Sequence, residues 1–226
     1  MQSRDRLVVA LDVSKREDVL RLVDALHGVA GMFKLGLQAF IANGPSIVRE
    51  VVSRGERVFL DLKIHDIPNT ARNAVAEAAA LGASIATVHA AGGEAMLRAC
   101  AHDSLLVLAV TMLTSLDDAE LQRIGMSGSA VENAVRLAQL AKSAGLRGVV
   151  ASPHEIAPIR DACGSGFVIL TPGIRPGGSD AGDQRRTMTP REAIEAGADY
   201  LVVGRPITNA ADPRSAASRI LEEMSS

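Results

Sequence analysis

Short apolar runs rich in β-branched residues recur along the whole chain, and polar residues follow each of them. Buried parallel strands have this pattern because helices cover both faces of the sheet, which leaves no solvent-facing side to carry polar residues. The runs predict strands at 7–12, 32–37, 57–62, 84–89, 105–111, 147–152, 167–172 and 199–204.

The segments between these runs have helical periodicity. Apolar residues are spaced three or four apart, as amphipathic helices require; examples are Val19, Leu22, Val23 and Leu26, and later Val131, Val135, Leu137 and Leu140. Strand–helix units repeated in this way predict a (β/α)8 TIM barrel, a fold that typically takes ~250 residues. We expect residues 1–226 to form this one domain.

A doubly wound open sheet is the structural alternative. That fold more naturally has fewer strands and a glycine-rich turn after the first one. The residues after the first predicted strand, Asp12-Val13-Ser14-Lys15, do not make such a turn.

Composition narrows the function classes. The chain is 47% apolar and 22% charged, which is enough for one sizeable core, and its net charge of −2 gives no support for nucleic-acid binding. No apolar stretch approaches the ~18 residues of a membrane helix, and the first apolar run is too short for a signal peptide. With only Cys100 and Cys163, neither in a C-x-x-C motif, we expect a cytoplasmic protein with two buried thiols.

Polar residues gather where the predicted strands end. In a barrel the active site lies at the carboxyl ends of the strands, so these residues are the candidates for chemistry. They are Asp12, Lys34, Asp61, Lys63, His89, Thr114, Ser152, Gly204 and Arg205.

The segment that follows the third strand carries most of the information. Side chains alternate along a strand, so Asp61 and Lys63 are expected to point together into the barrel mouth. With Lys34 and Asp66 they would form a network of alternating charges, because buried charges need partners. A salt-bridge cluster on the surface is the alternative explanation.

A long irregular segment, rich in Gly, Pro, Asp and Arg, runs from Thr171 to Thr189 after the seventh strand. Long loops inside compact domains are usually functional. We expect residues 173–189 to close over a ligand; an ordinary surface loop is the alternative.

Residues 61–70 match the motif D-x-K-x-x-D-I-P-x-T without a gap. In this motif, and in further segments in the same order, the chain resembles the orotidine 5′-phosphate decarboxylase family. The further segments are Leu11-Asp12, Phe33-Lys34-Leu35-Gly36, Thr87-Val88-His89-Ala90, Leu113-Thr114-Ser115, Ala151-Ser152-Pro153-His154-Glu155, Thr171-Pro172-Gly173-Ile174-Arg175, Asp183-Gln184-Arg185-Arg186 and Val203-Gly204-Arg205-Pro206-Ile207.

The resemblance implies a cofactor-free and metal-free decarboxylation of orotidine 5′-monophosphate (OMP) to UMP, the last step of de novo pyrimidine nucleotide biosynthesis. Lys63 would donate a proton to C6 of the pyrimidine after carbon dioxide leaves. Asp61 would lie against the substrate carboxylate, and Lys34 would hold Asp61 and contact the ribose. The resemblance also implies a homodimer, in which Asp66, Ile67 and Thr70 would reach the neighbouring subunit's site.

The resemblance also assigns the substrate-binding residues. Asp12 would bind the ribose hydroxyls, Ser152 would contact the pyrimidine edge, and Thr114 would be a further contact. The phosphate would be held by Gln184, the backbone amide of Gly204, Arg205 and, near it, Arg175.

These residue types suit the reaction. Loss of carbon dioxide leaves a carbanion that no adjacent carbonyl delocalises, so the site must supply preorganised positive charge and then a proton. An ammonium held by flanking carboxylates does both.

Two other functions stay open at this point. One is a magnesium-dependent sugar-phosphate decarboxylase or aldolase of the same suprafamily, although the Lys34 ammonium would repel its metal. The other is a non-catalytic phosphate-binding barrel.

The histidines do not have the spacing of metal ligands, and His89 is expected to be structural.

Overall fold

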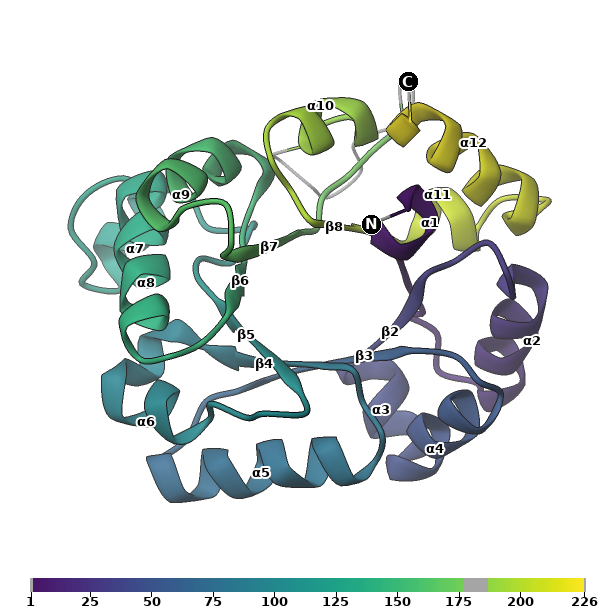
Figure 1. Ribbon diagram of the computed structural model, residues 1–226, viewed down its shortest axis with the longest axis horizontal. Helices are drawn as coiled ribbons and strands as arrows, with labels where there is room; N and C mark the ends of the chain where they lie inside the picture. The colour runs from purple at the N-terminus through teal and green to yellow at the C-terminus, as the bar shows by residue number, and fades with distance from the viewer. Residues whose placement is uncertain (1, 177–186, 226) are drawn as a thin grey trace.

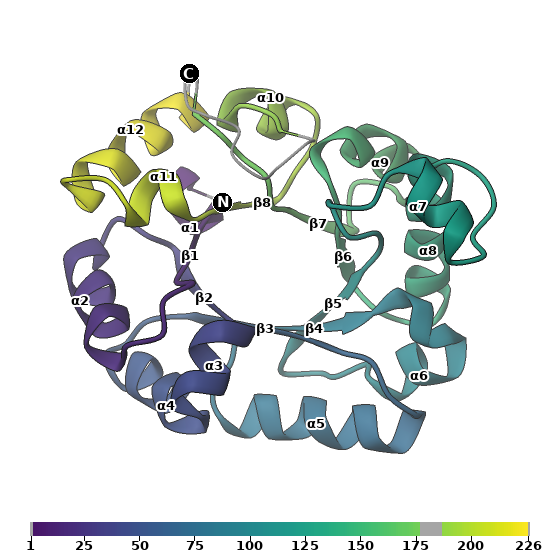
Figure 2. The same cartoon turned by 180° about the vertical axis from the view of Figure 1, so that it is seen from behind.

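Eight parallel strands close into a barrel in chain order, with β1 paired to both β2 and β8 (Figure 1; β1 is labelled in Figure 2). The structure is a computed structural model that describes residues 2–176 and 187–225. The strands are β1 (Leu7–Ala10), β2 (Met32–Gly36), β3 (Val58–Ile64), β4 (Ile85–His89), β5 (Leu106–Val110), β6 (Gly148–Val150), β7 (Val168–Thr171) and β8 (Tyr200–Val203). The predicted TIM barrel is confirmed, and the open sheet is excluded because β8 hydrogen-bonds to β1.

Helices form an outer ring around the barrel, as the views from its two sides show (Figures 1 and 2). Short 3-10 turns follow β4 and β6, at Ala90–Gly92 and Pro153–Glu155. The helices are α1 (Ser3–Arg6), α2 (Arg16–Leu26), α3 (Leu37–Asn43), α4 (Pro45–Ser53), α5 (Pro68–Ala80), α6 (Gly93–Ala99), α7 (Asp118–Arg123), α8 (Ala130–Ser143), α9 (Ile156–Cys163), α10 (Pro190–Glu195), α11 (Arg205–Thr208) and α12 (Pro213–Ser225).

The predicted helices form, and in one of them small residues bury more completely than most of the apolar residues whose spacing predicted it. In α2 the buried residues are the four predicted ones. In α8 the periodic valines, Val131 and Val135, are only half-buried, and the buried face is centred on Ala134, Ala138 and Ala141.

Two separate apolar layers support the barrel. The larger one fills the space between the strands and the helices. The smaller one lies inside the barrel, beneath the carboxyl ends of the strands, and contains Phe59, Ile85, Leu108 and Leu170. The interior layer gives the polar residues above it a packed, rigid floor.

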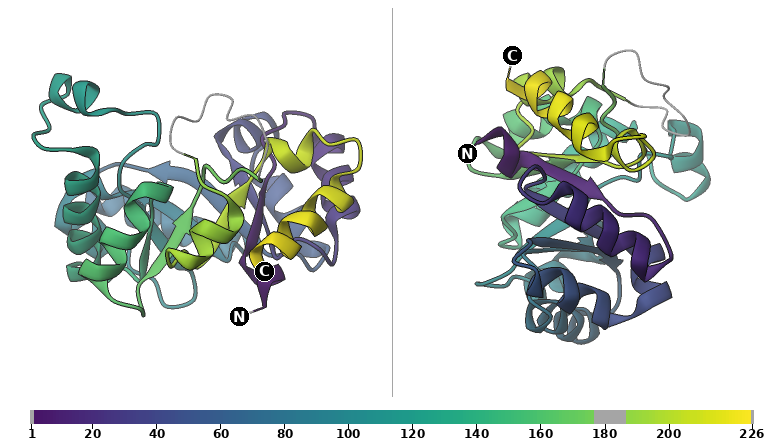
Figure 3. Two further views of the ribbon diagram at one scale, coloured as in Figure 1. Left: turned by 90° about the horizontal axis from the view of Figure 1, so that it is seen from above. Right: turned by 90° about the vertical axis from the view of Figure 1, so that its right-hand side faces the viewer.

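The rim at the carboxyl ends of the strands carries the longest loops. The segment between β5 and α8, which includes α7, projects beyond the barrel (Figure 3, teal). After β7 the two ends of the loop are held together: Ile174 pairs with Met188, and the Arg175 N–H donates to the Met188 carbonyl at 3.0 Å. The middle of the predicted 173–189 loop, including Gln184, lies outside the described residues.

Both cysteines are buried and unpaired, as expected. Burial raises the pKa of the Cys100 thiol to about 11, which makes it unreactive at neutral pH. Among the described residues no helix is both long and apolar enough to cross a membrane.

Candidate active site

A pocket of about 480 Å³ opens at the carboxyl ends of the strands. Its polar and charged lining residues come from most strand ends around the barrel, as expected for this fold. They are Asp12, Lys34, Gln38, Asp61, Lys63, Thr114, Arg175 and Arg205, and Gly173 and Gly204 contribute backbone.

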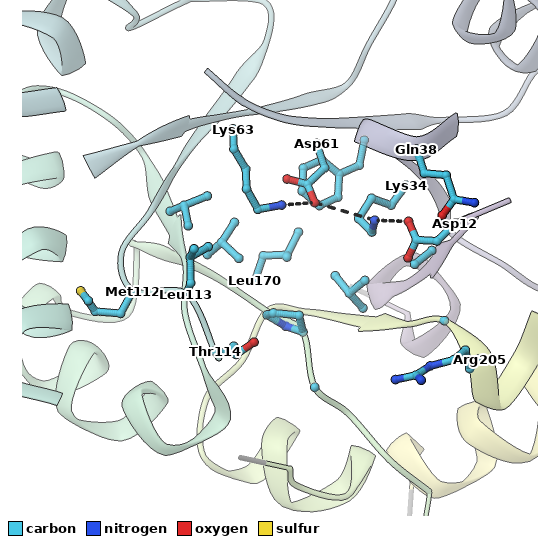
Figure 4. Close-up of a pocket in the computed structure, with 18 of the residues that line it drawn as sticks. Asp12, Lys34, Gln38, Asp61, Lys63, Met112, Leu113, Thr114, Leu170 and Arg205 are labelled. Carbon is cyan, nitrogen blue, oxygen red and sulfur yellow. Dashed lines mark hydrogen bonds and ion pairs between the residues drawn. The ribbon is translucent and has the colours of Figure 1, made fainter. Parts of the chain in front are cut away.

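Four charged side chains form a continuous row along one wall of this pocket (Figure 4). The Lys63 ammonium donates to Asp61 Oδ2 at 2.8 Å, and Lys34 Nζ lies 3.8 Å from the same oxygen. Lys34 also donates to Asp12 Oδ1 at 2.9 Å. The row therefore alternates in sign and has no net charge.

Burial makes this pairing necessary. The side chains of Lys34 and Asp61 are each only 11% exposed, whereas that of Lys63 is 31% exposed. A buried charge without a partner is strongly destabilising, so Asp61 depends on its two ammonium neighbours. The surface salt-bridge alternative therefore does not apply to Asp61 and Lys34.

The strand that carries Asp61 and Lys63 is irregular where they sit. Its register with β4 moves from Leu60 opposite Ala86 to Ile64 opposite Val88. Lys63 has φ 52°, and among the described residues it is the only one other than glycine in the left-handed region. Both side chains nevertheless line the pocket, as does Phe59, whereas Leu60, Leu62 and Ile64 face the outer core, so the expected alternation along β3 holds through the irregularity.

The lack of a side chain at Gly36 leaves room for the ion pair between Lys34 and Asp12. A Cβ at this position would lie 2.9 Å from Lys34 Nζ and 3.1 Å from Asp12 Oδ1. The backbone φ of −89° suits any residue, so the constraint on Gly36 is space rather than conformation. The motif Phe33-Lys34-Leu35-Gly36 by itself gives no sign of this role.

The opposite side of the pocket is cationic. Arg205, at the first position of α11 directly after β8, faces the pocket across from the charged row (Figure 4). Arg175 also lines it, and its Nη1 donates to the Ile174 carbonyl at 2.9 Å. The pocket thus combines an alternating charge row at one end with two guanidinium groups and glycine backbone at the other.

Three of the predicted site residues do not line this pocket. Asp66, Ile67 and Thr70 lie in an exposed stretch just beyond β3, and the side chain of Asp66 accepts a hydrogen bond from the Ile67 N–H at 2.7 Å. Asp66 and Ile67 instead line a separate groove, together with His65, Pro68, Ala91 and Gly92.

Ser152 and His89 also lie outside the pocket wall. Ser152 is fully buried, and its hydroxyl has no hydrogen-bond partner among the described residues, so its contact with a pyrimidine stays a prediction. His89 is half-buried, with its ring centroid 5.5 Å from that of His65. Burial, then His65 and Lys63, lower the pKa of His89, which keeps it neutral at neutral pH.

Two further groups at the site were not predicted from the sequence. Thr87 is fully buried on β4 and hydrogen-bonds to Asp61. Gln38 lines the pocket and donates to Ser14 Oγ at 3.0 Å. The only sequence signal for Thr87 is a hydroxyl-bearing residue within an otherwise apolar strand.

The fold and the pocket define a (β/α)8-barrel enzyme whose site has guanidinium groups suited to a phosphate at one end and a row of paired charges at the other. Residues 5–220 match the protein-family model described as "Orotidine 5'-phosphate decarboxylase / HUMPS family". The chain belongs to this family.

Individual relatives agree with this assignment. The orotidine 5′-phosphate decarboxylase of Moorella thermoacetica is 52% identical over 99% of this chain and 94% of its own length. That of Heliobacterium modesticaldum is 50% identical over 99% and 97%. The crystal structure of orotidine 5′-phosphate decarboxylase from Lactobacillus acidophilus is similar with a TM-score of 0.87 and 34% identity, covering 97% of this chain and 99% of that one.

The role of Gly36 leads to a first prediction. In Gly36→Ala the added methyl group displaces the flexible ends of Lys34 and Asp12, so the ion pair is lost while the fold is kept. A charged hydrogen bond is worth ~1.5–3 kcal/mol, so kcat/KM for the family's substrate, OMP, should fall roughly 10- to 100-fold. Thermal unfolding should stay close to that of the wild type.

Gly166→Ala is the matched control, because a Cβ there meets nothing within 4 Å and its φ is not positive. Wild-type kcat/KM in Gly36→Ala would show that the Lys34–Asp12 pair is dispensable.

Proposed function

We propose that this pocket decarboxylates OMP to UMP and carbon dioxide, the last step of de novo pyrimidine nucleotide biosynthesis. The observation that carries the proposal is the Lys63–Asp61–Lys34 row, which holds an ammonium at the end of the pocket remote from the arginines. Family membership and relatives with about half of their residues identical support the activity and its class, a carboxy-lyase.

In the proposed reaction the bond between C6 and the carboxylate breaks, and its electron pair stays on C6. The Lys63 ammonium stabilises the developing negative charge and then transfers one proton to C6. Its contact with Asp61 at 2.8 Å holds it in place before the substrate binds, so little reorganisation is needed during the reaction.

Asp61 has a second role in this scheme. Its carboxylate would lie against the substrate carboxylate, and the repulsion between them would be relieved as carbon dioxide departs. Lys34, at 3.8 Å, would hold Asp61 in place and contact the ribose together with Asp12.

The remaining pocket residues would bind the rest of the nucleotide. Arg205 and the Gly204 amide would hold the phosphate, with Arg175 near it; an Arg guanidinium is a forked donor that matches phosphate oxygens. Gln184 belongs to the same set by resemblance. Thr114 lines the pocket, and we assign it a contact with substrate.

The donor set does not favour a metal-dependent reaction of the sugar-phosphate type. A magnesium ion prefers carboxylate oxygens, but Lys34 already pairs with Asp12 at 2.9 Å and approaches Asp61. A divalent cation placed between these carboxylates would meet the Lys34 ammonium. The scheme needs neither a metal nor an organic cofactor.

The fourth charge of the catalytic network would come from a second copy of the chain. Asp66 is exposed and follows the strand end, while Ile67 is an apolar side chain that is 68% exposed. Asp66 and Ile67 lie outside the lining of this chain's own pocket, as a contribution to a partner's pocket requires. We therefore propose an isologous homodimer in which Asp66, Ile67 and Thr70 complete the partner's pocket. The buried free thiols support a cytoplasmic location.

The direct test is to add OMP to the purified protein and follow the loss of its ultraviolet absorbance. We expect turnover that survives dialysis against EDTA, because positive charge comes from Lys63 rather than a metal. Absence of turnover would refute the proposed function, and a loss restored by magnesium would favour the sugar-phosphate alternative.

Replacing Lys63 separates chemistry from binding. Lys63→Ala removes both the positive charge and the proton donor, so kcat should fall by more than about 10²-fold. UMP should still bind measurably, because the ribose and phosphate contacts remain; equilibrium titration checks this. A variant that kept a tenth of the activity would show that Lys63 is not the proton donor.

Subunit mixing tests the shared site. Lys63→Ala and Asp66→Ala are each expected to be nearly inactive, yet in a mixed dimer one site carries both changes and the other carries neither. Random reassociation of equal amounts makes roughly half of the dimers mixed, so about a quarter of all sites should be intact. If mixed dimers form and no activity returns, Asp66 acts within its own subunit.

A further inference from the structure

The number of residues in β3 and β4 does not match at the point where the charged row begins. Between the pairs Leu60–Ala86 and Ile64–Val88, three residues of β3 stand opposite the single residue Thr87 of β4. Extra residues in one strand interrupt the regular ladder and re-aim the side chains next to them, and such irregularities are frequent beside active sites. The three residues are Asp61, Leu62 and Lys63, so the mismatch includes both members of the closest ion pair within the charged row.

The Thr87 side chain fills this mismatch. Its Oγ1 accepts a hydrogen bond from the backbone N–H of Lys63 at 2.9 Å. The same hydroxyl donates to Asp61 Oδ1, also at 2.9 Å. One hydroxyl therefore connects the main chain of Lys63 to the carboxylate that holds the Lys63 ammonium.

The two hydrogen bonds constrain different degrees of freedom. The bond from the Lys63 N–H supports a backbone with φ 52°, a conformation that residues with a Cβ rarely adopt. The bond to Oδ1 fixes the carboxylate plane of Asp61 and leaves Oδ2 directed at Lys63 and Lys34. A strained conformation persists only where its surroundings determine it in this way.

Thr87 makes these contacts from beneath the pocket. Its side chain is fully buried, and it is not among the residues that line the cavity. It lies on the same face of β4 as Ile85, a member of the apolar layer inside the barrel. Thr87 thus links the rigid floor to the charged row without reaching a ligand.

We propose that Thr87 is a positioning residue that sets the orientation of both Asp61 and Lys63 for the chemical step. This proposal rests on the proposed function of the pocket, but its structural part holds for any substrate. Because Thr87 acts through these two residues, its loss should lower the rate of the chemical step much more than the affinity for a nucleotide.

The test compares two hydroxyl-removing substitutions of the same kind. Thr87→Val keeps the shape and removes both hydrogen bonds. Thr111→Val is the matched control, because Thr111 is also a buried threonine at a strand end. Its hydroxyl donates to the Val150 carbonyl at 3.1 Å. Loss of this hydroxyl leaves the carbonyl satisfied, because the Thr111 N–H donates to the same oxygen. Thr87→Ser restores the hydroxyl without the methyl group.

For turnover of OMP we expect kcat to fall at least tenfold in Thr87→Val and to stay within about twofold of the wild type in Thr111→Val. Binding of UMP, measured by titration, should change by less than about threefold in both. Thr87→Ser should recover most of kcat. Unchanged kcat in Thr87→Val, or equal losses in Thr87→Ser and Thr87→Val, would overturn the proposal.

Hydrogen exchange gives a readout that does not depend on the substrate. The Lys63 amide should exchange faster in Thr87→Val than in the wild type and at the wild-type rate in Thr111→Val. If the wild-type protein fails to turn over OMP but the Lys63 amide still exchanges faster in Thr87→Val, the proposed function alone is refuted. Unchanged exchange in Thr87→Val would refute the role of Thr87. If Thr87→Val does not fold, Thr87→Ala is the second hydroxyl-free variant, and the same differences are required of it.

Discussion

The carboxylate of Asp61 is the group on which the site depends. It is almost completely buried, and it contacts Lys63 at 2.8 Å, Lys34 at 3.8 Å and Thr87 at 2.9 Å. Removing one partner of a buried ion pair costs about 3–5 kcal/mol, because the remaining charge is left without compensation. Asp61 and the two ammonium groups therefore hold one another in position.

The barrel supplies the rigidity that this arrangement requires. An ammonium accelerates a reaction most when it already occupies the place where negative charge develops, since it then needs no reorganisation. Three members of the row, Lys34, Asp61 and Lys63, stand on β2 and β3, above the apolar layer that contains Phe59 and Ile85, and Asp12 follows the end of β1. Gly36 contributes in the opposite way, by leaving the space in which Lys34 reaches Asp12.

The two ends of the pocket have different tasks. The charged row is assembled within the barrel, whereas the cationic end is built on the segments that follow β7 and β8, with Arg175 and Arg205. Such separation lets the binding energy of a remote phosphate help to organise the reacting end of a substrate. The proposed contribution of Asp66 from a second subunit would add a third source of constraint.

The sequence by itself determined the eight strands and most helices, because a buried parallel strand and an amphipathic helix each impose a periodicity that a local pattern records. It also located Asp61, Lys63, Lys34 and Arg205 at strand ends. Only the tertiary structure decided the extra residues in β3, the left-handed Lys63, the contact of Thr87 with Asp61 and the alanine face of α8. These features arise from the register of neighbouring strands and from the space between barrel and helix, which distant parts of the chain set together.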